Sequence, residues 1–252
     1  MDIAIIGYGK MGHEIERIAR AKGINARTID PNEPSANYKQ INNESMRNVD
    51  VCVDFTHPDS VIGNIEKIAK FRKNMVVGTT GWYDKSEKVR KIVENAKIGL
   101  IWSGNFSIGV NIYFKVIENA ARIMNKFSDY DVFVHEFHHN KKADSPSGTA
   151  VMIGNILIDN LDRKKKVVTE ELKRRIAPDE LHVSSTRGGS IPGTHIVGFD
   201  SPADTIELTH TARGREGFAS GAVTAAQWIQ GKKGFYGIND MMKEIMGGGK
   251  NV

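Results

Sequence analysis

Residues able to do acid–base chemistry and bind anions are concentrated in one stretch, Glu136–Ala150. It holds two adjacent histidines, two adjacent lysines and an aspartate, followed by a Ser-Gly-Thr turn. Histidine exchanges protons near neutral pH, and a lysine ammonium stabilises anionic groups. The alternative is a solvated basic loop that carries no chemistry. The density of functional groups favours a functional loop; its candidate residues are His138, His139, Lys141, Lys142, Asp144, Ser147, Gly148 and Thr149.

Two regular elements must position this loop. Residues 130–135 are rich in β-branched and aromatic side chains, which predicts a strand, and residues 150–158 predict a helix. Ser147 can cap that helix, so that the N–H groups of Gly148 and Thr149 point toward an anion. Functional residues are often carried on such a loop between rigid elements.

Residues 135–139 match His-Glu-x-x-His, the zinc protease signature, which requires a helix that brings both histidines to one metal. Here the local sequence predicts a strand instead. On a strand, positions four apart are separated by roughly 13 Å at about 3.3 Å per residue. Two ligands that far apart cannot share a zinc ion that each must approach to about 2 Å. We therefore expect no metal site.

The N-terminus carries a glycine pattern in a specific context. A short apolar strand, residues 2–6, precedes Gly-x-Gly-x-x-Gly, and a helical pattern follows. A second strand ends at an acid 18 residues past the last glycine, near the expected place for a ligand of ribose hydroxyls. The alternative is a glycine turn that only packs. The context favours a dinucleotide site at Gly7, Tyr8, Gly9, Lys10, Met11, Gly12 and Asp30.

Strands continue to alternate with helices up to about residue 107, which predicts a parallel sheet. Two polar turns, residues 78–81 and 103–107, follow predicted strands. Each turn alone could be a simple connection. Because ligands bind at the carboxyl ends of parallel strands, we expect these turns to converge on the dinucleotide site. The residues concerned are Gly78, Thr79, Thr80, Ser103, Gly104, Asn105 and Phe106.

The second half of the chain has a different pattern. A long helix is predicted from 108 to about 127, and a helix over 217–229 precedes a short helical segment and a glycine-rich tail. Between them lie alternating segments that predict a mainly antiparallel sheet with one open face, suited to an oligomer interface. These segments are 131–136, 181–185, 194–199 and 205–210.

Composition sets limits on function. The 252 residues carry a net charge of +5, and no basic tract is interleaved with aromatics, so we expect no nucleic-acid partner. The run Arg163–Lys166 is interpreted as a solvated helix end. The single cysteine, Cys52, lies in an apolar run and is expected to be a buried thiol in a cytoplasmic protein. No signal peptide or membrane-spanning segment is predicted.

Along nearly its whole length the sequence resembles the 4-hydroxy-tetrahydrodipicolinate reductases, formerly called dihydrodipicolinate reductases, of the diaminopimelate route to lysine. His-His-x-x-Lys-x-Asp-x-Pro-Ser-Gly-Thr is the most specific shared motif; the glycine fingerprint and the Gly-Thr-Thr-Gly turn also occur in other reductases. The matching segments are Gly7–Gly12, Asp54–Thr56, Gly78–Gly81, Asn105–Asn111, His138–Thr149 and Arg215–Ala222.

The resemblance implies a Rossmann-like, doubly wound α/β domain from residues 1–107 and 216–252. An α+β domain, 108–215, is implied to bind substrate and to form a homotetramer. NADH or NADPH would be the cofactor and a small cyclic imine with two carboxylates the substrate. Asp30 should favour NADH, while Lys10 could partly offset its repulsion of the NADPH phosphate.

The resemblance also implies roles for individual residues. His138 is the acid–base residue and Lys142 the second catalytic donor, with Lys141 as a rival. Ser103-Gly104 replaces the more usual Ala-Pro, which we expect to change only the turn. His139, Gly148 and Thr149 are implied to bind substrate, and Ser103, Gly104, Asn105 and Phe106 to lie along the cofactor.

Two other functions are consistent with the first domain alone. One is another two-domain oxidoreductase, such as an amino-acid or sugar dehydrogenase. The other is a nucleotide-sensing protein without turnover. Neither accounts for the histidine–lysine motif.

Overall fold

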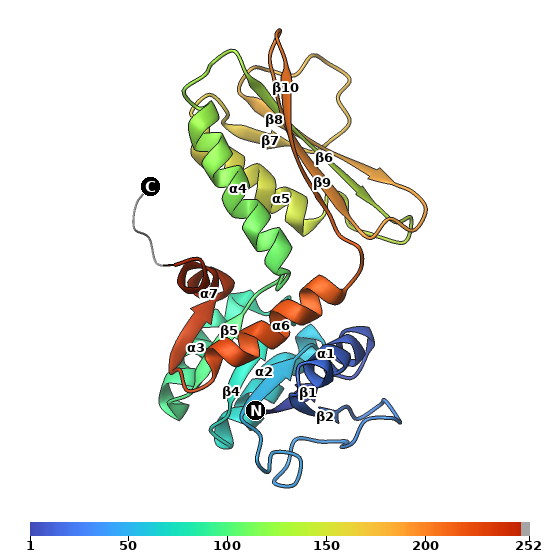
Figure 1. Cartoon of the computed structure of the whole chain (residues 1–252), viewed down its shortest axis with the longest axis vertical. Coiled ribbons are helices and arrows are strands. Elements are labelled where there is room, and N and C mark those ends of the chain that lie inside the picture. The colour runs from blue at the N-terminus through green and yellow to red at the C-terminus, as the bar shows by residue number, and fades with distance from the viewer. Residues whose placement is uncertain (248–252) are drawn as a thin grey trace. The chain divides into compact units, whose positions relative to one another are not determined.

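The computed structural model describes residues 1–247, and in it the chain divides into two compact units (Figure 1). Unit 1 contains Met1–Ile108 and the chain from Arg215 onward, and unit 2 contains Gly109–Gly214. Unit 1 is therefore assembled from both ends of the sequence. Most of the glycine-rich tail lies outside the described residues.

A six-stranded sheet forms the centre of unit 1, in the order β11-β5-β4-β3-β1-β2, and every neighbouring pair is parallel. The predicted doubly wound Rossmann-like sheet is thus confirmed. Its strands are β1 (Asp2–Ile6), β2 (Asn25–Ile29), β3 (Val51–Asp54), β4 (Asn74–Val77), β5 (Gly99–Trp102) and β11 (Gly234–Gly237). The helices are α1 (Lys10–Ala21), α2 (Pro58–Lys70), α3 (Ser86–Ala96), α6 (Glu216–Ile229) and α7 (Ile238–Ile245), with a 3₁₀ turn at Tyr83–Lys85.

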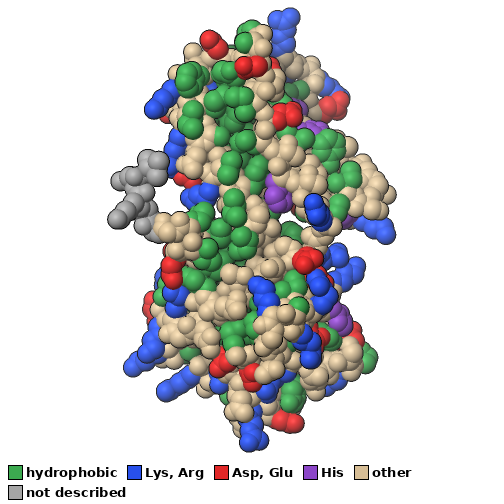
Figure 2. Space-filling model, viewed as in Figure 1, with side chains coloured by type: hydrophobic (Ala, Val, Ile, Leu, Met, Phe, Trp, Pro, Cys, Tyr) green, Lys and Arg blue, Asp and Glu red, His purple; other side chains and the backbone are tan. Residues whose placement is uncertain are grey.

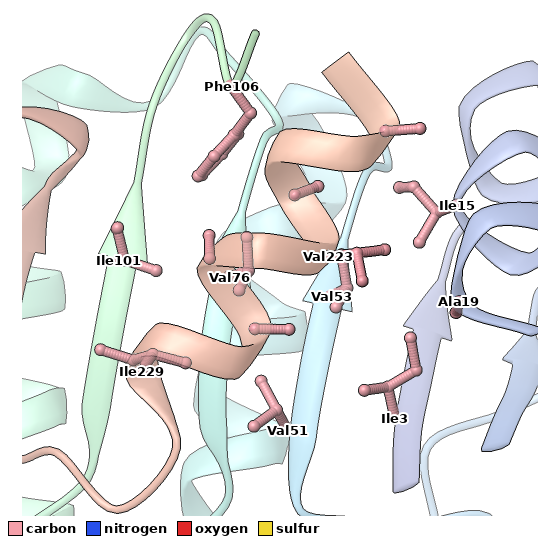
Figure 3. Close-up of a cluster of buried hydrophobic side chains, with 14 of the residues drawn as sticks. Ile3, Ile15, Ala19, Val51, Val53, Val76, Ile101, Phe106, Val223 and Ile229 are labelled. Atoms are coloured by element: carbon pink, nitrogen blue, oxygen red, sulfur yellow. The ribbon is translucent and has the colours of Figure 1, made fainter. Parts of the chain in front are cut away.

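Helices cover both faces of this sheet, which explains why its central strands are apolar throughout. On one face, α1, α6 and α7 contribute to one core cluster; on the other, α2 and α3 contribute to a second. Figure 3 shows α6, which carries Val223 and Ile229, passing in front of the strands that carry Val53, Val76 and Ile101. The C-terminal helix α6 therefore completes the core that the first strands begin.

The last strand, β11, was not predicted, whereas the short helical segment expected after residue 229 is present as α7. The sequence of β11, Gly-Phe-Tyr-Gly, has two glycines and no alternating pattern, so it carries almost no local strand signal. It forms because the preceding α6 delivers it beside β5, where Phe235 pairs with Leu100 in parallel register.

Unit 2 contains a five-stranded sheet in the order β10-β9-β6-β8-β7. The longer pairs, β9–β10 and β6–β9, are antiparallel, so most paired residues are antiparallel as predicted, and the shorter pairs β6–β8 and β7–β8 are parallel. The connection that contains α5 returns the chain to the starting end of the sheet after β6, and residues 169–179 do the same between β7 and β8, so these strands run parallel. The elements are α4 (Ile108–Met124), β6 (Asp131–His138), α5 (Gly148–Asn160), β7 (Lys166–Val168), β8 (Glu180–Arg187), β9 (Thr194–Asp200) and β10 (Thr205–Thr211).

Residues of α4 and α5 pack with β6, β8 and β9 in one core, so the helices cover one face of this sheet. On the other face, Phe133 remains 37% exposed, and His135 and Phe137 lie in ring contact with centroids 4.4 Å apart. The outward side of α4 also exposes apolar residues, including Ile112, Val116 and Ile123. Figure 2 shows hydrophobic side chains gathered over the region of α4.

Two compositional predictions have different outcomes. Cys52 is a buried free thiol, as expected. The run Arg163–Lys166 is not simply a solvated helix end: Lys164 is only 2% exposed, and its ammonium donates to the carbonyls of Pro178 and Glu180. The prediction failed because a lysine can be buried when its three protons find acceptors, which local composition does not reveal. No helix among residues 1–247 is long and apolar enough to span a membrane.

Candidate functional site

The predicted cofactor residues gather at the carboxyl edge of the unit 1 sheet, here called the cofactor edge. Gly7 follows β1 with φ of +89°, and a Cβ there would lie 2.4 Å from the Phe55 carbonyl oxygen. At Gly12 a Cβ would lie 2.3 Å from the Gly7 oxygen, so this glycine permits close helix–strand packing. A Cβ on Gly9 would meet nothing within 4 Å. Gly9 therefore leaves space for a ligand at the start of α1, where the helix dipole favours a pyrophosphate.

Asp30 lies directly beside this loop. Its Oδ2 accepts from the Tyr8 N–H at 2.8 Å, and its Oδ1 accepts from the N–H groups of Asn32 and Glu33 at 2.8 and 3.1 Å. Burial raises the pKa of the Asp30 carboxyl, but these three N–H groups outweigh burial and hold the pKa below its usual value. An ionised carboxylate at the end of β2 suits ribose hydroxyls and repels a ribose phosphate.

The two turns after β3 and β4 are tied together by a buried carboxylate that sequence reasoning did not assign. Asp54 is 1% exposed; its Oδ1 accepts from the hydroxyls of Thr56 and Thr79, each at 2.7 Å, and its Oδ2 from Asn64 at 2.9 Å. Burial raises the pKa of Asp54, and the hydroxyl and amide donors oppose that shift. The sequence feature that could have indicated this role for Asp54 is the tripeptide Asp-Phe-Thr at the end of an apolar strand.

The turn after β5 lies beside the turn after β4. The Ser103 N–H donates to the Val77 carbonyl at 3.2 Å, and the Ser103 hydroxyl both donates to the Asn105 carbonyl and accepts from the Asn105 N–H. A Cβ on Gly104 would lie 3.7 Å from the Thr80 methyl group. Phe106, which was also predicted to lie along the cofactor, has its side chain in the unit 1 core and is only 1% exposed.

The predicted catalytic loop lies in unit 2, between β6 and α5. Residues 135–138 form the end of β6, so the His-Glu-x-x-His pattern does start on a strand, as predicted. Ser147 caps α5 by accepting from the Ala150 N–H at 3.2 Å, also as predicted, and Gly148 begins the helix. The elements expected to position the loop are therefore the ones observed.

The two lysines of this loop differ in burial and in their contacts. The Lys142 ammonium lies 2.8 Å from the Asp144 carboxylate with its side chain 24% exposed, and the Lys142 N–H donates to the His139 carbonyl at 3.2 Å. Lys141 is exposed. The His139 Nδ1 is buried without a hydrogen-bond partner in the described part of the chain. Lys142 and His139 thus have the partly buried setting of ligand-binding groups.

A cluster not predicted from sequence surrounds His138. We call Glu136, His138, Ser147, Arg187 and His195 the Glu136 cluster. Glu136 is fully buried, and its Oε1 accepts from the Ser147 N–H at 2.9 Å and from Arg187 at 2.8 Å. Its Oε2 accepts from the Ser147 hydroxyl and lies 3.4 Å from both His138 Nδ1 and His195 Nε2. Strand pairing explains this arrangement, since Glu136 is opposite His195 and His138 is opposite Arg187.

Glu136, His138 and His195 each place a potential metal ligand within 4.8 Å of the others. The surroundings oppose a cation, however. The carboxylate already accepts from an N–H group, two hydroxyls and a guanidinium, and the Arg187 cation would repel a second positive charge. The arrangement is better suited to orienting imidazole rings.

Burial lowers the pKa of His138 to about 4. The Glu136 carboxylate acts in the opposite direction, while His195, Lys142 and Arg187 lower the pKa further. Burial also raises the pKa of Glu136, but hydrogen bonds from His195, Ser147 and Arg187 dominate and hold it well below its usual value. At neutral pH the cluster therefore contains a neutral His138 beside an ionised carboxylate.

Comparison with known proteins identifies the family. Residues 1–106 match the family described as dihydrodipicolinate reductase, N-terminus, and residues 109–242 match dihydrodipicolinate reductase, C-terminus. The 4-hydroxy-tetrahydrodipicolinate reductase of Christiangramia forsetii is 35% identical over 97% of this chain and 99% of its own. That of Methanoregula boonei is 39% identical over 77% of this chain and 74% of its own.

A solved structure has a similar fold. The dipicolinate-bound dihydrodipicolinate reductase from Paenisporosarcina sp. TG-14 superposes with a TM-score of 0.77, at 24% identity, over 96% of this chain and 99% of that chain. At this identity the likeness supports the fold, while the sequence matches establish the family. Because those matches extend over both units, the chain belongs to the dihydrodipicolinate reductase family.

Proposed function

We propose that this chain reduces 4-hydroxy-tetrahydrodipicolinate to tetrahydrodipicolinate with NADH or NADPH, in the diaminopimelate route to lysine. As a member of the dihydrodipicolinate reductase family it is an NAD(P)H-dependent oxidoreductase. The observation that carries the substrate assignment is the strand–loop–helix segment of unit 2. On it, His138, Lys142 and the start of α5 are presented by a single buried frame.

This segment fits a small dianion. Gly148 and Thr149 begin a helix, whose N-terminus favours a carboxylate. His139 and Lys142 can add charge-assisted hydrogen bonds to the same molecule. The Paenisporosarcina neighbour was solved with dipicolinate, an aromatic dicarboxylate, which agrees with a dianion of this shape. We therefore assign these four residues to substrate binding, with Lys142 also stabilising charge in the transition state.

His138 is proposed to transfer the proton. Its buried, neutral ring can take up a proton when a dianion approaches and can pass it to the substrate. This transfer is distinct from binding, which is assigned to His139, Lys142 and the start of α5.

The cofactor edge is proposed to hold the dinucleotide. The loop Gly7–Gly12 would bind the pyrophosphate, Asp30 the ribose hydroxyls, and the turns Gly78–Thr80 and Ser103–Phe106 would lie along the remainder. When bound, the reduced nicotinamide supplies the hydride. Asp54 would hold the turns after β3 and β4 in place through Thr56 and Thr79.

The test is a turnover assay with purified protein. The cyclised product of pyruvate and aspartate semialdehyde is added with NADH or NADPH, and oxidation of the nicotinamide and formation of tetrahydrodipicolinate are followed. Turnover that depends on the substrate supports the proposal. Nicotinamide binding without turnover would instead indicate a nucleotide sensor, and turnover only of an amino acid or sugar would indicate a different dehydrogenase; family membership favours neither outcome.

We further propose a homotetramer that associates through the open face of the unit 2 sheet. That face carries the aromatic side chains Phe133 and Phe137, and Phe133 is 37% exposed. Light scattering should give the mass of four chains, and Phe133→Glu should reduce that mass. A cytoplasmic location is proposed from the single free cysteine, Cys52.

A further inference from the structure

We infer that Glu136 is a positioning residue whose buried carboxylate fixes the His138 ring and the N-terminus of α5 relative to each other. The inference rests on the proposed function and deepens it, because it identifies what holds the proton-transfer group and the anion-binding helix in one geometry.

The helix side of this link runs through Ser147. Its N–H and its hydroxyl both donate to Glu136, while its hydroxyl oxygen accepts from the Ala150 N–H and so caps α5. Ser147 is 3% exposed and Glu136 is fully buried, so neither can exchange its partner for water. An ionised carboxylate at zero exposure requires such donors, since an unpaired buried charge is strongly destabilising.

The loop is held by a second link. Arg187 donates one amino group both to Glu136, at 2.8 Å, and to the Asp144 carbonyl, at 2.6 Å. Ser185 donates its hydroxyl to the same carboxylate at 2.8 Å. The loop between His138 and α5 is therefore attached to β8 through Arg187, which also binds the Glu136 carboxylate.

The contacts around the His138 ring determine which of its two nitrogens is available to the ligand. Glu136 Oε2 lies 3.4 Å from His138 Nδ1, a contact that can shorten into a hydrogen bond when the ring is charged. A Cβ on Gly193 would lie 2.9 Å from His138 Nε2, so glycine at this position leaves room beside that nitrogen. A carboxylate at Nδ1 favours the tautomer with its proton there and leaves Nε2 as the nitrogen that exchanges a proton with the ligand.

Glu136→Gln keeps the shape and removes the charge. The Gln oxygen is expected to face the Ser147 N–H and Arg187, which places its NH₂ group toward His138 Nδ1. That donor favours the opposite tautomer, the same kind of error that disables a histidine when its orienting carboxylate is amidated. Loss of the carboxylate also lowers the pKa of His138, because of the charges that face the ring only Glu136 favours its protonated form; His195, Lys142 and Arg187 oppose it.

The experiment measures kcat, KM and the NMR titration of the His138 ring in wild type and Glu136→Gln. We expect kcat to fall by about 10²-fold or more, and the ring to titrate at lower pH than in wild type. Glu180→Gln is the matched control: Glu180 is 8% exposed in the same unit and pairs with Arg174 through two contacts of 2.7 and 2.8 Å. The control should retain wild-type kcat and His138 titration.

A double-mutant cycle separates positioning from general damage. If Glu136 acts on kcat through His138, Glu136→Gln should cause little further loss of kcat in a His138→Gln background. An equal loss in both backgrounds, or a wild-type kcat and titration in Glu136→Gln, would overturn the inference. If Glu136→Gln does not fold, Glu136→Asp keeps the charge but shortens its reach, and an unchanged kcat in that variant would also overturn it.

Failure of the inference can be distinguished from failure of the proposed function. The His138 titration is measured without substrate, so it tests the link between Glu136 and His138 even if wild type shows no turnover. If wild type turns over and the variants change neither kcat nor the titration, only the inference fails.

Discussion

Burial of His138 makes a specific prediction about stability in acid. The folded state holds the pKa of His138 near 4, against an ordinary value of 6.5. The unfolded chain therefore binds a proton between these values while the folded chain does not, so stability is present above pH 6.5 and is lost as the pH falls toward 4. His138→Gln removes this proton-linked effect but keeps a polar side chain of similar size.

The magnitude follows from the size of the shift. At about 1.4 kcal/mol per pKa unit, the His138 contribution that wild type loses between pH 7 and 5.5 is about 1 kcal/mol, and by pH 4 it is about 3 kcal/mol. These are upper figures, because water that reaches the ring reduces the shift. Glu136 also titrates in acid, but it is present in both proteins, so the comparison between them isolates His138.

Urea unfolding of both proteins at pH 7, 5.5 and 4 measures the effect. The difference in unfolding free energy between wild type and His138→Gln should change by these amounts in favour of the variant as the pH falls. If the pH profiles of wild type and His138→Gln run parallel, His138 is not held neutral by the fold and the electrostatic argument is wrong.

Three further predictions concern catalysis. His138→Gln should lower kcat by about 10²- to 10⁴-fold with NADH affinity nearly unchanged; a raised KM with preserved kcat in steady-state kinetics would mean that His138 only binds the dianion. Lys142→Ala should both raise KM and lower kcat, because its ammonium is partly buried, whereas the exposed Lys141→Ala should do little; equal effects of the two would refute the assignment. Asp30→Ala should shift the ratio of kcat/KM values toward NADPH, and an unchanged ratio would show that Asp30 is not the ribose ligand.

Local patterns in the sequence predicted much of this protein. Alternating apolar strands and amphipathic helices predicted the parallel sheet of unit 1, because burial on both faces leaves a continuous apolar signal in each strand. The glycine spacing predicted the turn before α1, since a side chain at Gly7 or Gly12 would collide with nearby backbone. The strand, the loop and the Ser147 cap were predicted for the same reason: their signals lie within a few residues of the structure they specify.

Only the tertiary structure decided which distant residues meet. Glu136 meets Arg187 and His195 because of the register of three strands, and register depends on pairing that no single strand encodes. Lys164 is buried because carbonyl groups from a later segment happen to converge on its ammonium. The strand β11 forms because α6 leaves it beside an unpaired sheet edge, although two of its four residues are glycines, which disfavour strands. In each case the stabilising partner lies outside the local segment, so the local composition cannot predict the contact.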